Sequence, residues 1–256
     1  MSIPDFPPGA PCWIDLLTRD LDAAKSFYSQ LFGWNYEVGD EENDGGYLTA
    51  TKDGLAVAGL MSNDPDNDYP DVWSTYLRAD DIGALADKAE FHGGQVYLPP
   101  VEVPEQGRMA MIGDHSGLGV GLWQFAGHTG YQSQGEPGTP AWHELHTRKF
   151  ESSTKFYSQA LGWELEVLSD NDQFRYQTLG SGEQARAGIM DISHFDDPSL
   201  AGWKIYFNVA DVDQTVATAV AAGGAEISAP MDSDFGRVAV IADPTGAEFY
   251  VIAANN

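Results

Sequence analysis

The sequence predicts an α+β protein made of two tandem copies of one domain, each built from two βαβββ modules. The first observation is an internal repeat, because the residues around Trp13 recur around Trp142, 129 positions later. The second is that strand-like and helix-like segments follow one another in the same order in both copies. Fixed spacing over this length indicates a duplication of almost the whole chain.

The repeat also sets the expected domain boundaries. Trp13-Ile14-Asp15-Leu16-Leu17-Thr18-Arg19 matches Trp142-His143-Glu144-Leu145-His146-Thr147-Arg148, and later landmarks are paired glycines at 93–94 and 223–224 and turns that begin at Asp114 and Asp243. A segment rich in Gly, Ser, Gln and Pro lies between the copies. We therefore expect a first domain over 1–126, a linker over 127–138 and a second domain over 139–256.

The first module begins with a strand over 9–19, in which side chains alternate between two faces. Asp20 and Asp22 then provide helix-start signals, apolar residues recur at helical spacing, and Gly33 ends the helix. Short strands are expected over 34–38, 47–51 and 55–61.

The second module repeats this order with a strand over 72–79, a helix over 82–92 and strands near Val96, Met109 and Val120. In the second half, helices are expected over 152–161 and 212–222.

Composition narrows the function classes. The longest apolar runs are far shorter than the roughly 18 residues of a membrane span, and the N-terminus lacks signal-peptide features, so a soluble cytoplasmic protein is expected. The net charge is −26, from 13 basic and 39 acidic residues. Without clustered Lys and Arg, nucleic acid is not an expected partner. An acidic, well-solvated surface is the simplest interpretation, and steering of a cationic ligand is the alternative.

The motifs resemble a known family. Arg-Asp-Leu-Asp-Ala-Ala-Lys-Ser-Phe-Tyr at 19–28, Asp-Pro-Thr-Gly at 243–246 and Gly-Gly after the second helix are similar to the vicinal oxygen chelate superfamily, which includes glyoxalase I, extradiol dioxygenases and bleomycin resistance proteins. Within it, the chain resembles tandem glyoxalase-like proteins of bacteria. The resemblance implies two mixed sheets, each curled into an open cup from two modules, with helices outside and a small-molecule pocket inside.

Metal-dependent members of this superfamily place His or Gln on the first strand of each module and Glu on the last. By spacing, these positions fall on Trp13, Gly59, Ser74, Gly121, Trp142, Gly188, Lys204 and Tyr250. None of these residues is a usual ligand of a divalent metal. We therefore expect no metal cofactor, and a divalent metal is the alternative, although the superfamily ligand positions are not matched.

Strand alternation identifies the candidate catalytic residues. If Trp142 faces its cup, Glu144 and His146 lie beside it on the same face. A carboxylate can orient an imidazole as a general base, raise its pKa or contribute to an unorthodox metal site. The alternative is a buried acid that caps backbone donors or pairs with Arg148. Because the first half has Leu17 where the second has His146, the function is expected in the second cup more than in the first.

The candidate ligand-binding residues are those expected to face the two cups on neighbouring strands. They are Trp13, Asp15, Tyr76 and Arg78 in the first half, and Trp142, Tyr206, Asn208 and Tyr250 in the second. Aromatic walls with few polar groups suit a small-molecule pocket, although a close-packed core would show the same residues.

Three functions remain open. The first is a metal-free protein that binds, and possibly converts, a small hydrophobic or aromatic metabolite. The second is an enzyme, either a glyoxalase-like lyase or a metabolite-modifying oxygenase or hydroxylase, with a site at Glu144 and His146. The third is a structural or interaction protein whose cups are filled by side chains. A small-molecule ligand is expected as the partner, and the chain is expected to be a monomer or a homodimer.

Overall fold

The computed structural model describes residues 5–39, 46–64, 66 and 68–254. In the first half, the order strand, helix, three strands occurs twice. The elements are β1 (Pro11–Thr18), α1 (Leu21–Phe32), β2 (Asn35–Val38), β3 (Leu48–Lys52), β4 (Leu55–Ser62), β5 (Val72–Arg78), α3 (Ile82–Phe91), β6 (Gln95–Val103), β7 (Gly107–Gly113) and β8 (Gly119–Phe125).

The second half repeats this order. Its elements are β9 (Pro140–Thr147), α4 (Phe150–Leu161), β10 (Leu165–Asp170), β11 (Arg175–Leu179), η1 (Gly182–Gln184), β12 (Ala187–Asp191), η2 (Pro198–Leu200), β13 (Gly202–Asn208), α5 (Val212–Ala221), β14 (Ala225–Ser233), β15 (Gly236–Ala242) and β16 (Glu248–Ala253). None of the helices in the described ranges has the length and apolar content needed to cross a membrane.

Each half forms one eight-stranded mixed sheet. The strand orders are β2-β3-β4-β1-β5-β8-β7-β6 and β10-β11-β12-β9-β13-β16-β15-β14. The two modules of each sheet meet at an antiparallel central pair, β1 with β5 and β9 with β13, and this pair is flanked by parallel pairs. The predicted fold class, four βαβββ modules in two curled sheets, is therefore confirmed.

The helix boundaries follow from local chemistry. The Asp20 side chain accepts a hydrogen bond from the Ala23 amide at 2.9 Å, which caps the first turn of α1. Gly33 ends the helix in the left-handed conformation, with φ of 70°, which costs glycine little. The long β1 strand before α1 is thus held in a fixed register relative to the helix.

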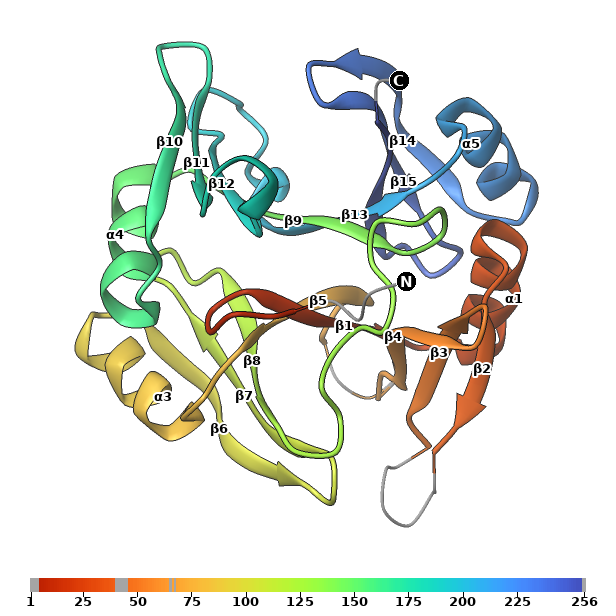
Figure 1. Ribbon diagram of the computed structural model, residues 1–256. Coiled ribbons are helices and arrows are strands. Elements are labelled where there is room, and N and C mark those ends of the chain that lie inside the picture. The colour runs from red at the N-terminus through yellow and green to blue at the C-terminus, as the bar shows by residue number, and fades with distance from the viewer. Residues whose placement is uncertain (1–4, 40–45, 65, 67, 255–256) are drawn as a thin grey trace.

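The two sheets lie with their convex faces toward each other, and their concave faces open in opposite directions (Figure 1). At the sides of this arrangement, helices of different halves pair: α1 packs against α5, and α3 packs against α4. The convex faces are therefore buried between the halves, and the concave faces form two cups.

The buried core joins residues of both halves. Phe27 and Phe32 of α1 belong to one cluster with Phe207 of β13 and Phe249 of β16, and the Phe32 and Phe207 ring centroids are 4.9 Å apart. A second cluster contains Phe156 and Tyr157 of α4 together with Leu77, Ala110 and Leu122 of the first sheet. Each first-module helix is thus buried against the last module of the other half.

The paired glycines of the repeat make this docking possible. A Cβ atom on Gly224 would lie 2.7 Å from Phe27 Cε2, and one on Gly94 would lie 2.5 Å from Phe156 Cε2. Only a residue without a side chain allows these phenylalanine rings to approach the backbone of the other half.

The Asp-x-x-Gly turns also connect the halves. One oxygen of Asp243 accepts from the Thr245 amide inside its own turn at 2.8 Å, and the other accepts from the Tyr28 hydroxyl of α1 at 3.1 Å. Asp114 of the first half does the same, because it accepts from the Ser116 amide at 2.7 Å and from Ser153 of α4 at 2.6 Å. In each half, the aspartate of this motif therefore stabilises its own turn and accepts a hydrogen bond from a helix of the opposite half.

His143 is a core residue of this interface. Its Nδ1 lies 3.1 Å from Thr75 Oγ1 of β5, and its Nε2 lies 2.9 Å from the hydroxyl of Tyr131. Tyr131 lies within the predicted linker. Burial lowers the pKa of His143 to about 3, so the ring is neutral near pH 7. The segment between the halves is thus packed against both sheets in this region.

We predict that the two halves unfold in one transition, because they share their cores. Phe27→Ala should reduce the free energy of unfolding by about 3–5 kcal/mol, since Phe27 is fully buried between the halves. Phe91→Ala is the control, because Phe91 is 85% exposed, and should change it by less than about 0.5 kcal/mol. Urea unfolding followed by tryptophan fluorescence and by far-UV circular dichroism measures both. Two separated transitions would contradict the shared core.

Candidate functional site

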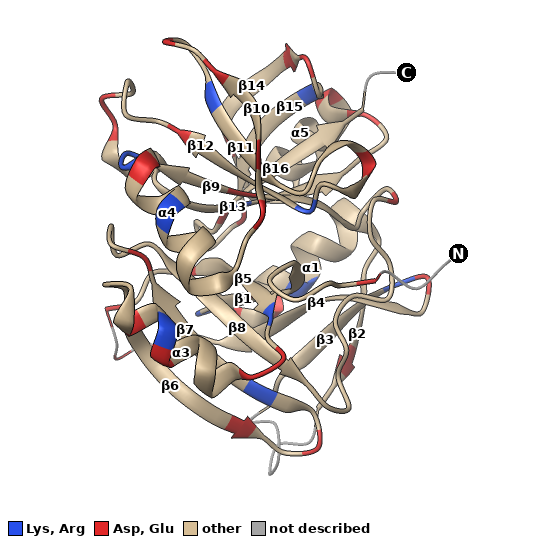
Figure 2. Ribbon diagram, turned by 60° about the vertical axis from the view of Figure 1, so that its left-hand side comes forward, with Lys and Arg blue, Asp and Glu red and all other residues tan. Residues whose placement is uncertain are grey.

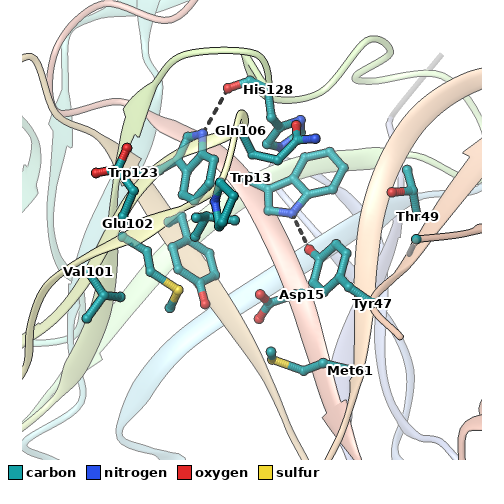
Figure 3. Close-up of a pocket in the computed structure, with 15 residues that line it drawn as sticks. Trp13, Asp15, Tyr47, Thr49, Met61, Val101, Glu102, Gln106, Trp123 and His128 are labelled. Atoms are coloured by element: carbon teal, nitrogen blue, oxygen red, sulfur yellow. Dashed lines mark hydrogen bonds between the residues drawn. The ribbon is translucent and has the colours of Figure 1, made fainter. Parts of the chain in front are cut away.

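The first cup contains a cavity of about 390 Å³. Its walls come from β1, β3, β4, β5, β6, β7 and β8 and from the segments after β2, β6 and β8 (Figure 3). The lining residues are Trp13, Asp15, Gly39, Tyr47, Thr49, Met61, Tyr76, Val101, Glu102, Val103, Pro104, Gln106, Met109, Trp123 and His128. This volume lies within the range of ligand pockets, and the walls are mostly aromatic and apolar.

Hydrogen bonds fix the aromatic walls. The Trp13 indole donates to the Tyr47 hydroxyl at 2.8 Å, and the Trp123 indole donates to the His128 carbonyl at 3.0 Å. Figure 3 shows Trp13, Tyr47, Asp15 and Met61 turned toward a common space. Because their polar atoms are satisfied within the wall, these rings present mainly their apolar surfaces to the cavity.

Asp15 is the carboxyl group inside this cavity. It is 6% exposed, and burial raises its pKa to about 7, although a hydrogen bond from Tyr76 acts in the opposite direction. Burial likewise holds the pKa values of Tyr47 and Tyr76 well above the usual range, so both hydroxyls stay protonated. Near neutral pH, Asp15 is thus divided between its acid and its carboxylate forms.

His128 reaches the cavity from the chain that follows β8. Its ring centroid lies 4.2 Å from that of Trp13 in an edge-to-face contact. Burial lowers the pKa of His128 to about 4, so it is neutral at physiological pH. Its Nε2 atom is buried and has no hydrogen-bond partner among the described residues.

Tyrosine rings occupy the places where the family resemblance implies glutamate ligands. A Cβ atom on Gly59 would overlap the Tyr47 hydroxyl, and one on Gly121 would overlap the Tyr76 ring. In the second half, a Cβ atom on Gly188 would overlap the Tyr176 hydroxyl. A larger residue at any of these glycines would displace the wall of its cup.

The donors around the first cavity do not fit a divalent metal. Asp15 pairs in register with Gly59 and Ser74, and Trp13 pairs with Tyr76. The described residues contain no group of three or more His, Cys, Asp or Glu side chains that could hold a metal ion. We predict that the purified protein holds no stoichiometric Zn, Ni, Fe or Mn in a superfamily-type site, and elemental analysis tests this.

The second cup holds a hydrogen-bonded acid–base network. His146 Nε2 lies 2.6 Å from Glu144 Oε1, and the Tyr176 hydroxyl donates to the other oxygen of Glu144. Tyr206 also donates to Glu144 Oε1, at 3.3 Å. Burial acts to raise the pKa of Glu144, but His146 and the donors of Tyr176 and Trp142 outweigh it and lower the pKa. Glu144 is therefore a carboxylate at neutral pH.

Tyr250 occupies the second cup where the first has Gly121. Its ring centroid lies 4.5 Å from that of Tyr206 and 6.0 Å from that of His146. The Trp142 indole donates to Tyr176 at 2.9 Å, which repeats the contact of Trp13 with Tyr47. The two cups thus share an indole–tyrosine wall and differ in the residues at their centres.

Two predicted ligand-binding residues lie outside these groups. The Arg78 guanidinium donates to the Phe6 carbonyl and to Asp80, and it does not line the first cavity. The Asn208 amide donates to the Gly135 carbonyl, so it fixes the segment between the halves. Both residues satisfy backbone groups in the described structure.

Several lining residues were absent from the sequence-based candidates. Tyr47 could have been found, because Tyr176 occupies the equivalent position 129 residues later and both follow a turn. Met61 likewise matches Met190. His128 carried no such signal, because it lies at the start of a segment without apolar periodicity.

Family models match both halves of the chain. Residues 12–122 match the model described as "Glyoxalase/Bleomycin resistance protein/Dioxygenase superfamily", and residues 143–252 match the model described as "Glyoxalase-like domain".

Whole-length relatives and solved structures agree with these matches. The chain is 38% identical to "Putative glyoxylase CFP32" of Mycobacterium bovis over 97% of this chain and 96% of that protein. It is 32% identical to "Anthracycline biosynthesis protein DauV" of Streptomyces sp. over 96% of this chain and 94% of that protein.

The fold resembles that of a Mn(II)-bound glyoxalase from Novosphingobium aromaticivorans, with a TM-score of 0.66, 18% identity and coverage of 96% of this chain and 82% of that one. It also resembles that of the 2,3-dioxygenase LapB from Pseudomonas sp. KL28, with a TM-score of 0.67, 14% identity and coverage of 97% and 94%. The chain therefore belongs to the glyoxalase/bleomycin resistance protein/dioxygenase superfamily, with one such domain in each half.

Proposed function

We propose that the protein binds a small aromatic molecule in the first cup. The supporting observation is the cavity of about 390 Å³, whose walls include Trp13, Tyr47, Tyr76 and Trp123. Flat rings held in place by hydrogen bonds offer stacking and edge-to-face contacts to an aromatic ligand without further ordering of side chains. Asp15 and the neighbouring hydroxyls provide the few polar groups that orient a ligand in such a pocket.

The names of two relatives are consistent with this proposal. Anthracyclines are polycyclic aromatic compounds, and the relative from Streptomyces sp. is named for their biosynthesis. The relative from Mycobacterium bovis is named "Putative glyoxylase CFP32". An enzyme of either named kind must bind its substrate, so ligand binding is the function proposed for the first cup.

The ligand site should respond to a change in cavity volume. Met61→Trp places a large ring in the first cavity and should weaken binding of 2-naphthylmethanol at least about tenfold, because the ligand and the new indole compete for the same space. Met190→Trp makes the same change at the equivalent position of the second half and should leave the affinity unchanged. Isothermal titration calorimetry measures both. A loss confined to Met190→Trp would place the ligand in the second cup.

The protonation of Asp15 should appear in the stability of the free protein. Its pKa is about 7 in the folded chain and, as for an exposed aspartate, about 4 in the unfolded chain. Between these values the folded state holds a proton that the unfolded state has lost, so the free energy of unfolding falls as the pH rises through this window. Above about pH 7 the loss is complete.

We predict that Asp15→Asn removes this pH dependence. Relative to the wild type, the variant should gain about 2 kcal/mol of stability between pH 5 and pH 8. Glu144→Gln is the matched comparison with the opposite sign, because the pKa of Glu144 is lowered and its carboxylate is stabilised by hydrogen bonds. It should reduce stability at pH 7 by more than about 1 kcal/mol, and this difference should shrink in acid. Urea titrations at several pH values test both signs.

A second candidate function is acid–base catalysis in the second cup, and the 2.6 Å contact between His146 and Glu144 supports it. A glyoxalase-like reaction moves a proton between neighbouring carbons, and an imidazole oriented by a carboxylate can act as the base.

For this candidate, we expect turnover of methylglyoxal with glutathione, and a loss of at least about 100-fold in His146→Leu, which copies the first half. Leu17→Ala, the change at the equivalent position of the first half, should retain turnover. A wild-type protein without turnover, or a fully active His146→Leu variant, would contradict this second candidate.

A further inference from the structure

The first cavity contains negative charge without a matching positive charge. Asp15 lies inside it and Glu102 lines its rim, whereas none of the described lining residues is Lys or Arg. His128 stays neutral, because burial lowers its pKa to about 4. Glu102 has an ion pair with Arg108 at 3.6 Å, on the exposed side of the rim. The Asp15 carboxyl accepts a hydrogen bond from Tyr76, and none of the described lining residues brings a cationic side chain to it.

The second half shows how the same scaffold position satisfies a carboxylate. Glu144 is equivalent to Asp15, and its oxygens accept from tyrosine hydroxyls and from His146 at 2.6 Å. The residue equivalent to His146 is Leu17, which has no polar atom in its side chain. At this position, the first cup thus lacks the nitrogen donor that His146 supplies in the second cup.

The aromatic walls suit a cation as well as a ring. The faces of indole and phenol rings attract ammonium groups, and this attraction grows when water is excluded. An anion in the same place would lose its hydration beside Asp15 without gaining a counter-charge. The whole chain has 39 acidic and 13 basic residues, for a net charge of −26, and Figure 2 shows acidic residues on elements of both halves. This field raises the local concentration of cations.

We infer that the first cup selects aromatic ligands that carry a protonated amine, and that Asp15 binds this ammonium group in the role that His146 has beside Glu144. The inference rests on the proposed ligand site and adds the chemical class of the ligand. The first cup should therefore bind organic ammonium compounds more tightly than anionic compounds such as carboxylates.

Three naphthalene probes of similar shape separate the effect of charge from that of the ring. They are 2-naphthylmethylamine, 2-naphthylmethanol and 2-naphthoate, which are cationic, neutral and anionic at pH 8. By isothermal titration calorimetry, the amine should bind at least about tenfold more tightly than the alcohol, and the carboxylate should bind most weakly. Asp15→Asn should reduce the affinity for the amine to about that for the alcohol, and it should change the affinity for the alcohol by a much smaller factor.

Two further measurements test the pairing with Asp15. Leu17→His places an imidazole where the second half has one, and it should weaken binding of the amine more than that of the alcohol. Between pH 8 and pH 6 the amine should lose affinity, because Asp15 takes up a proton with a pKa of about 7. The hydroxyls of Tyr47 and Tyr76 stay protonated and His128 stays neutral over this range.

The outcomes separate the two proposals. If the amine and the alcohol bind equally, or if 2-naphthoate binds most tightly, the inference on charge is wrong and the aromatic ligand site stands. An unchanged preference for the amine in Asp15→Asn would also overturn it. If none of the three probes binds, the proposed ligand site fails, and the inference fails with it.

Discussion

The architecture depends on the reciprocal burial of each first-module helix against the sheet of the other half. Phe27 of α1 approaches the backbone at Gly224, and Phe156 of α4 approaches the backbone at Gly94. Aspartates of the Asp-x-x-Gly turns complete the contact from both sides. Because the convex faces and the helices are buried between the halves, the concave faces are the parts of the sheets left to form cups. The glycines, phenylalanines and aspartates that recur in both copies of the sequence thus form the contact between the halves.

Duplication on this scaffold has allowed the two cups to diverge. Both keep an indole–tyrosine hydrogen bond and a glycine that accommodates the tyrosine hydroxyl. In the first cup, Asp15 lines a cavity of about 390 Å³. In the second, Glu144, His146 and Tyr250 form a connected network at the centre of the cup. At equivalent positions, the cups therefore differ between Asp15 and Glu144, between Leu17 and His146, and between Gly121 and Tyr250.

Much of the fold could be predicted from local patterns. Asp20 and Gly33 set the ends of α1, and the alternation along β1 correctly placed Trp13 and Asp15 on one face, because strand and helix geometry act over a few residues. The partner of each helix could not be predicted in this way. An apolar stripe on α1 indicates burial, but it does not reveal that the burying surface comes from a strand more than 200 residues away, at Phe249.

Only part of the candidate site could be predicted from the sequence, for a related reason. The expectation that function lies in the second cup rested on the titratable pair at Glu144 and His146, and the structure brings this pair together. Cavity volume, however, depends on how side chains from seven strands fill a space. The residues that line the first cavity are spread between Trp13 and His128, so no local pattern indicates the volume left between them. Arg78 was predicted to bind ligand because it lies on a cup strand, but its side chain donates to a backbone carbonyl instead.

The central claim is that the first cup is the ligand site, and fluorine NMR of protein labelled with 5-fluorotryptophan tests it most directly. The chain has seven tryptophans, and single Trp→Phe variants assign their signals. On titration with 2-naphthylmethylamine, the signals of Trp13 and Trp123 should shift in a saturable manner, whereas that of Trp142 should stay in place. A saturable shift of the Trp142 signal, with Trp13 and Trp123 unchanged, would contradict the claim.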